Sequence, residues 1–214
     1  MTKEAAFLVL AAGLAAAAML AGCSGDESAA ARIERMAREG DADGLAREAQ
    51  NPDADVSRMA VRALGGLGAK AVPQVEKALK DPRSEIREAA AIALPRVEKA
   101  KAARVLASVA KQDESASVRA AAATALGQIR AVDEVDALLA ALEDPDRTVR
   151  FRASAAMERI VSRRYEFYVD GTPEERHEAV EKFRAAWPAM RAEMRLLEEQ
   201  VRAFRQGQPR PSGK

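Results

Sequence analysis

The residue types that most often carry out chemistry are scarce in this chain. Its 214 residues include one histidine, His177 beside Glu178, and one cysteine, Cys23. A paired-metal site needs several imidazole or carboxylate ligands on neighbouring elements, which a single His-Glu pair cannot supply. The sequence also lacks a Ser/His/Asp constellation and a glycine-rich phosphate loop. We therefore expect no catalytic residue, no metal and no cofactor, and we interpret His177 as an exposed helix residue.

The bulk composition indicates a helical chain with a balanced surface. Apolar residues make up 48% of it, with alanine the most frequent among them, whereas aromatic residues make up 4%. Alanine is the strongest helix former, and its small side chain lets helices pack closely. The 34 basic and 33 acidic residues give a net charge of +1. That balance offers no excess of positive charge to attract nucleic acid.

The first 23 residues have the layout of a secretory signal. Lys3 precedes an uncharged apolar run at residues 5–20, and Leu-Ala-Gly-Cys follows at residues 20–23. The run is shorter than the roughly 20 residues that span a bilayer. The ending resembles the bacterial lipobox, which implies that residues 1–22 are removed as a signal peptide and that Cys23 receives lipid. An ordinary signal peptide and an uncut N-terminal anchor are the alternatives to this lipoprotein signal.

Residues 23–28 would then form a short polar tether to the bacterial cell envelope. Two or more acyl chains anchor a protein stably to a membrane. Ser24 rather than aspartate follows the cysteine, and by resemblance to known lipoproteins this favours the outer membrane or the periplasmic face. In a bacterium without an outer membrane, the protein would sit on the outer face of the plasma membrane.

An internal repeat organises residues 29–162. Four β-branched residues are spaced 30, 32 and 31 positions apart, and each is followed four residues later by alanine and eight residues later by leucine or methionine. These offsets place the three residues of each unit on one helical face. The β-branched anchors are Val56, Ile86, Val118 and Val149.

The first three units each continue with a second amphipathic stretch, at residues 72–79, 102–110 and 132–142. We interpret the intervening glycines and proline as helix breakers, namely Gly65, Gly66, Gly68, Pro95 and Gly127. A hairpin of about thirty residues cannot bury its own apolar face, so neighbours must stack. Residues 30–36 and 44–49 read as an atypical first hairpin.

The wording of the repeat, clearest at residues 118–127 as Val-Arg-Ala-Ala-Ala-Ala-Thr-Ala-Leu-Gly, resembles the short HEAT-like repeat of the phycobilin-lyase type. The resemblance covers roughly residues 50–162. It implies an all-α fold, a right-handed α-solenoid of the HEAT-like or armadillo type with about four to five helical hairpins and a helical C-terminal cap.

Aspartate and arginine also recur with the repeat. The members of this ladder are Asp81, Arg87, Asp113, Arg119, Asp144 and Arg150. In one interpretation the ladder is structural, with each aspartate capping the next helix and each arginine bridging to the neighbouring unit. In the other, the arginines form a basic ridge that receives acidic groups of a partner.

The C-terminal cap, residues 163–205, does not follow the repeat pattern. Residues 163–171 read as an irregular linker, and Thr172-Pro173-Glu174-Glu175 is typical of a helix start. We expect that helix to reach Trp187, a break or restart at Pro188, and a last helix to about Phe204. Residues 206–214 read as a disordered tail.

We expect a non-catalytic scaffold that binds a protein or peptide partner, is monomeric and is tethered to the envelope. The second helices would line the concave face, and cap aromatics would either seal the last repeat or bind a partner. The candidate partner-binding residues are Gln74, Lys77, Arg104, Ser108, Asp136, Tyr165, Tyr168 and Trp187.

Two alternatives remain open at this point. HEAT-like repeats also occur in lyases and in a di-iron hydroxylase, so the chain could be a lyase or oxidoreductase relative with no recognisable site left. It could also be an architectural envelope lipoprotein that spaces other components.

Overall fold

The computed structural model describes residues 27–206, apart from the side chains of residues 99 and 100. The predicted signal peptide (residues 1–22), Cys23 and the tail residues 207–214 lie outside the described residues. Between residues 27 and 206 the chain is helical, without a strand. No helix in that range is both long enough and apolar enough to cross a bilayer.

The helices follow one another as antiparallel hairpins. These are α2 (Ala29–Glu39) with α3 (Ala42–Glu48), α4 (Ala54–Gly66) with α5 (Val72–Ala78), α6 (Ser84–Val97) with α7 (Lys99–Gln112), and α8 (Ala116–Gln128) with α9 (Val135–Ala141). The 3-10 turns η1 (Gly68–Ala71) and η2 (Val132–Glu134) lead into α5 and α9. The chain ends with α10 (Arg147–Val161) and the long α11 (Pro173–Arg205).

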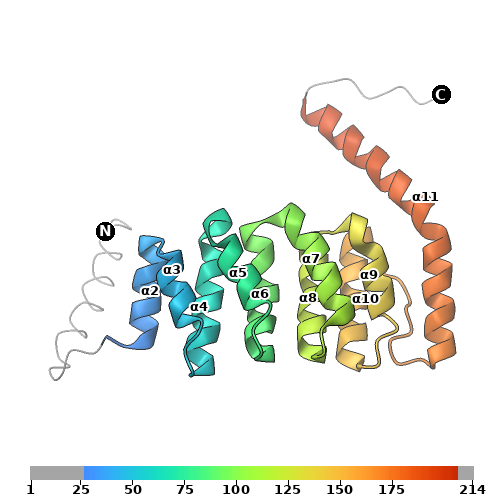
Figure 1. Cartoon of the computed structure of the whole chain (residues 1–214). Helices are drawn as coiled ribbons and strands as arrows, with labels where there is room; N and C mark the ends of the chain where they lie inside the picture. The colour runs from blue at the N-terminus through green and yellow to red at the C-terminus, as the bar shows by residue number, and fades with distance from the viewer. Residues whose placement is uncertain (1–26, 207–214) are drawn as a thin grey trace, which may run out of the picture.

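The hairpins stand side by side in one row, in chain order (Figure 1). The first helices α2, α4, α6, α8 and α10 each contact the next one along the row. The second helices α3, α5, α7 and α9 lie on the nearer side of the row in Figure 1. The prediction of an all-α solenoid is therefore confirmed, with four complete hairpins before α10.

One apolar core runs along the row and depends on the repeated positions. The anchor Ile86 is fully buried, and so are Ala90 and Leu94 on the same face of α6. The equivalent residues of α8 and α10 are also buried. The central helix α8 is apolar on nearly every side, and α6, α7 and α10 all pack around it. A helix that is apolar all round must be enclosed in this way.

Four of the five residues interpreted as helix breakers, all but Gly68, belong to an α-helix, so that interpretation was wrong for those four. Gly65 and Gly66 are the last two residues of α4, Gly127 lies inside α8, and Pro95 lies in the last turn of α6. Only Gly68 leaves the helical region, with φ of +63°. Gly127 has a packing role instead, because a Cβ there would lie 2.6 Å from Ala156 Cα on α10.

The expected break at Pro188 was also wrong, because α11 continues from Pro173 to Arg205 with Pro188 inside it. Figure 1 shows α11 changing direction near its middle, which is where Pro188 stands in its sequence. A proline inside a helix removes one hydrogen bond and bends the axis. The helix start is as predicted, since Thr172 and Glu175 form a reciprocal capping box.

The close approach of α8 and α10 predicts a sharp difference between two glycine substitutions. Gly127→Ala forces its Cβ against the α10 backbone and should lower the free energy of unfolding by about 1–3 kcal/mol. Gly66→Ala is the matched control, because nothing lies within 4 Å of its Cβ position, and it should leave stability unchanged or raise it by less than about 1 kcal/mol. Urea unfolding followed by circular dichroism measures both. Equal effects of the two substitutions would contradict the packing role of Gly127.

Candidate functional site

The arginines of the ladder reach from one repeat to the next. Arg87 on α6 donates from Nε and Nη2 to the two carboxylate oxygens of Asp113, at 2.9 and 3.0 Å. Arg119 on α8 makes the same fork to Asp144, at 2.8 and 2.9 Å. Two parallel charge-assisted bonds fix both distance and angle. Each fork therefore sets the position of one hairpin relative to the following one.

The remaining guanidinium nitrogen of each arginine binds its own unit. Nη1 of Arg87 donates to the carbonyl oxygens of Asp81 and Pro82, both at 3.0 Å. Nη1 of Arg119 and of Arg150 bind the carbonyls six and five residues before them in the same way. Each arginine thus binds the loop before its own helix and, at the same time, an acceptor in the next loop.

The ladder aspartates do not cap the first helices, contrary to expectation. The N-cap residues of α6, α8 and α10 are Arg83, Ser115 and Asp146. Each ladder aspartate instead accepts from the backbone N–H two residues later, at 2.9 Å for both Asp81 and Asp113. A short aspartate side chain readily closes such a local turn. This bond holds the loop in shape, and the same carboxylate also accepts hydrogen bonds from an arginine side chain.

Both ends of the ladder are completed by other groups. The first repeat has Ser57 where the others have arginine, and Arg83 of the following unit takes over by forking to Asp81 and donating to the carbonyl of Asn51 at 2.8 Å. At the other end, the cap linker after α10 supplies a backbone carbonyl in place of a ladder aspartate. There Nε of Arg150 donates to the carbonyl oxygen of Val169 in the cap linker, at 2.8 Å. Sequence reasoning missed the role of Arg83, because no other unit has an arginine at that position.

Burial and pairing shift the titration of these groups in consistent directions. The hydrogen bond from Arg83 is the main cause that lowers the pKa of Asp81. Burial alone would raise the pKa of Asp113, but the Arg87 and Ser115 hydrogen bonds together with nearby arginine charges lower it. The Asp113 hydrogen bond raises the pKa of Arg87, and the Asp144 hydrogen bond raises that of Arg119. The charged forms are therefore favoured, as structural ion pairs require.

The ladder does not present a basic ridge, because its arginines are occupied by groups of the chain itself. The side chains of Arg87 and Asp113 are only 9% and 10% exposed. Arg150 is buried as well. A partner would have to displace internal hydrogen bonds to reach these guanidinium groups. The interaction surface must therefore be sought elsewhere.

The predicted partner-binding residues of the second helices share one side of the row. Lys77 on α5, Arg104 and Ser108 on α7, and Asp136 on α9 are all exposed. Gln74 differs from them, because its Nε2 donates to Asp43 Oδ1 on α3 at 3.2 Å and its side-chain oxygen Oε1 is buried. We call the exposed side formed by α3, α5, α7 and α9 the second-helix face.

The charge of the second-helix face changes sign along the row. Helix α7 carries lysine and arginine but no acidic residue, and its exposed cations include Lys101, Arg104 and Lys111. The next segment is acidic, with Asp133 and Asp136 exposed. Lys101 also pairs with Glu76 of α5 at 2.7 Å, which links the second and third hairpins. The face thus offers a basic zone beside an acidic zone.

The cap aromatics form a packed cluster rather than an open patch. Phe183 is fully buried, with its ring centre 4.9 Å from Tyr165, 5.4 Å from Phe167 and 5.8 Å from Trp187. Tyr165 and Trp187 pack against the core of the last repeat, so two of the three predicted aromatic binding residues help to seal the row. Tyr168 alone of the three is strongly exposed, at 53%.

His177 is exposed, as the sequence suggested, and lies beside the end of α9. Its Nδ1 is 2.8 Å from Glu143 Oε1. Within residues 27–206, no group of three histidine, cysteine or carboxylate side chains is arranged to hold a metal ion. The contact joins α11 to the last complete hairpin.

These features define a class of protein, a stacked helical-hairpin repeat with a helical cap. The sequence matches the HEAT-repeat family model over residues 42–116 and again over residues 104–181. The chain belongs to the HEAT-repeat family.

Comparison with solved structures finds a further similarity. The chain is similar to the complex of CpcE and CpcF of phycocyanin lyase from Nostoc sp. PCC7120, with a TM-score of 0.47 and 23% identity over 66% of this chain and 68% of that chain. A search of curated proteins finds no match.

The forks predict that one buried and one exposed arginine contribute very differently to stability. Arg87→Ala leaves the Asp113 carboxylate buried without its partner and should lower the free energy of unfolding by about 3 kcal/mol. Arg147→Ala is the matched control, because Arg147 makes the same fork to Asp170 on the surface, at 2.6 and 2.7 Å with both side chains more than 60% exposed. Its effect should be small. Urea unfolding compares the two, and equal losses would contradict a structural role for the buried fork.

Proposed function

We propose that this protein is a non-catalytic protein-interaction module, held at the bacterial cell envelope by lipid on Cys23, which docks a protein or peptide partner on its second-helix face. One observation carries the proposal. The repeated polar residues of the ladder are engaged inside the row, whereas the polar residues of α5, α7 and α9 are exposed on one continuous side. Stacked repeats characteristically bind partners along such an extended side.

The charge pattern of the second-helix face supports a protein partner. Arg104 and Lys111 lie in the basic zone, and Asp136 lies in the adjacent acidic zone. Two neighbouring zones of opposite sign favour a partner with the complementary arrangement and repel one with the reverse arrangement. A nucleic acid, with negative charge throughout, would meet the acidic zone unfavourably.

The tether rests on the sequence alone. Ser28 caps α2, which begins at Ala29, so the first hairpin starts six residues after Cys23. So short a spacer would keep the row close to the lipid surface. The partner would then be another envelope component within reach of that surface.

Site-specific photo-crosslinking in cells tests the docking face. A benzoylphenylalanine introduced at Arg104 or Asp136 should capture the same discrete protein, because both positions lie on the second-helix face. The control is Arg62, which is exposed on the first helix α4 and should capture nothing discrete. Equal capture from position 62, or no capture from 104 and 136, would contradict the proposed face.

The tether has its own test. Cys23→Ala removes the only thiol that could accept lipid, so the protein should leave the membrane fraction or accumulate unprocessed. Cys23→Ser provides a second variant of the same kind, and membrane fractionation with immunoblotting reads out both. Normal processing together with retention in the membrane fraction would show that lipid on Cys23 is not the anchor, and it would leave the docking face to be judged separately.

A further inference from the structure

Helix α11 carries an apolar residue at alternating steps of three and four along most of its length. The members of this seam are Val180, Phe183, Trp187, Met190, Met194, Leu197, Val201 and Phe204. An average spacing of 3.5 residues keeps the seam on one side of a helix that packs along another helix. The residues of the seam up to Met194 and the three residues after it meet very different surroundings.

The first half of the seam is packed into the apolar core, where the rings of Tyr165 and Phe167 from the cap linker contact Phe183. Val180 and Phe183 are fully buried, and Met190 is 8% exposed. Beyond Met194 the cover ends. Figure 1 shows the second half of α11 rising above the row of hairpins, with no other helix beside it.

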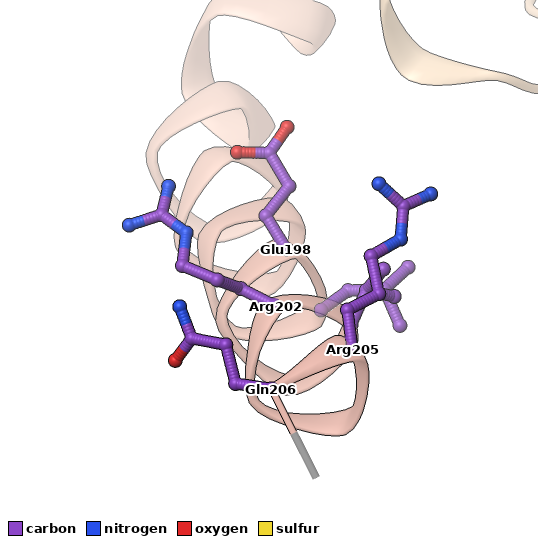
Figure 2. A pocket seen from close by; sticks show the side chains of 6 residues that line it. Glu198, Arg202, Arg205 and Gln206 are labelled. Atoms are coloured by element: carbon purple, nitrogen blue, oxygen red, sulfur yellow. The ribbon is translucent and has the colours of Figure 1, made fainter.

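The second half of the seam is uncovered. Leu197 is 60% exposed, Val201 44% and Phe204 70%. Among the described residues, the hollow beside them is lined only by α11 and its C-cap residue Gln206, with Glu198, Arg202 and Arg205 contributing polar side chains. Figure 2 shows these polar side chains extending from a single helix. A second wall for this hollow would have to come from outside the described part of this chain.

We propose that the second half of α11 pairs in antiparallel orientation with the same segment of a second copy of this chain. The interaction would continue, between two molecules, the seam that the first half of α11 uses within one molecule. It goes beyond the docking function proposed above, because the second-helix face takes no part in it. It also replaces the monomer expected from the sequence with a reversible dimer.

The charges beside the seam distinguish the two orientations. Glu198 and Arg205 stand on one flank, each directly after an apolar residue of the seam, and Glu193 and Gln200 stand on the other flank. In an antiparallel pair like flanks face each other, so Glu198 meets Arg205 of the second copy twice over, and Gln200 meets Gln200. In a parallel pair opposite flanks meet, which would set Glu193 against Glu198. The charges therefore favour the antiparallel pair.

The antiparallel register also matches the apolar residues. Leu197 lies opposite Val201 of the second copy, and Met194 lies opposite Phe204. Met194 is partly buried, and it lines two further hollows beside α11. The aromatic ring of Phe204 from the second copy would cover it, and thioether–aromatic contacts are favourable. Four apolar layers result, which fill the uncovered part of the seam from end to end.

The size of the surface sets the strength of the pairing. Two short seams cover less than the about 1,200 Å² that stable interfaces bury, so the dimer should form and dissociate with concentration. Attachment to one membrane would raise the local concentration of the segments. The pairing is thus suited to chains gathered on a common surface.

Two neighbouring leucines provide a matched test of the seam. Leu196 and Leu197 are 59% and 60% exposed, but only Leu197 belongs to the seam. The full chain, in a non-ionic detergent that keeps residues 5–20 from associating, should sediment as a concentration-dependent dimer. Leu197→Gln should weaken the dimer by at least about tenfold, since it removes a buried leucine from each copy. Leu196→Gln should leave the dissociation constant unchanged, and circular dichroism checks that both variants stay folded.

Charge reversal tests the orientation. Glu198→Arg should weaken the antiparallel dimer by placing it against Arg205, and the double variant Glu198→Arg with Arg205→Glu should restore it. In a parallel dimer, Glu198→Arg would strengthen association by meeting Glu193. Strengthening by the single variant would therefore overturn the proposed orientation.

Other outcomes overturn the proposal as a whole. These are a full chain that stays monomeric across the concentration series, or equal weakening by the two leucine variants. A monomer whose binding to phosphatidylglycerol vesicles is lost on Leu197→Gln would identify a lipid surface as the occupant instead. None of these results bears on crosslinking from Arg104, so failure of the dimer and failure of the docking face remain distinguishable.

Discussion

Everything in this molecule depends on the fact that one short helical hairpin cannot enclose its own apolar face. The residues that recur on that face, such as Ile86, Ala90 and Leu94, are buried only because the next hairpin covers them. Small residues make the approach close enough, as where Gly127 of α8 meets Ala156 of α10. Burial of each leucine-sized side chain contributes roughly 1.5–3 kcal/mol. The stacking of neighbours therefore supplies most of the stability, and the row has no independent unit.

The arginine–aspartate forks have a different role from the apolar core. A buried ion pair gains little net stability over well-packed apolar residues, although breaking one side of it is costly. The forks of Arg87 and Arg119 are thus better understood as fixing how far and at what angle each hairpin stands from the next. The first repeat has Ser57 at the position of the ladder arginine, and Arg83 takes over its role. The guanidinium of Arg83 binds both Asp81 and the carbonyl oxygen of Asn51, so one side chain again links two successive loops. With the ladder committed inward, interaction is left to the second-helix face and to α11.

Much of the fold could be predicted from the sequence because the repeat encodes it several times over. The anchors, the helix pairs and the capping box at Thr172 all follow from local spacing. Local signals failed where packing between helices decides, since Gly127 and Pro95 suggest turns until their neighbours are known. Pro188 was misjudged for a similar reason, because a bent helix and a broken one share the same sequence signal. The uncovered seam of α11 could have been found from its spacing, but its exposure could not, because that depends on where the row ends.

The central claim, that each hairpin is fixed by its neighbour, is tested most directly by a double-mutant cycle across one fork. Arg119 and Asp144 lie on successive units and bind through two hydrogen bonds of 2.8 and 2.9 Å. The free energies of unfolding of Arg119→Ala, Asp144→Ala and the double variant give their coupling. We expect a coupling energy of at least about 1 kcal/mol. Additive losses, within about 0.3–0.5 kcal/mol, would contradict it.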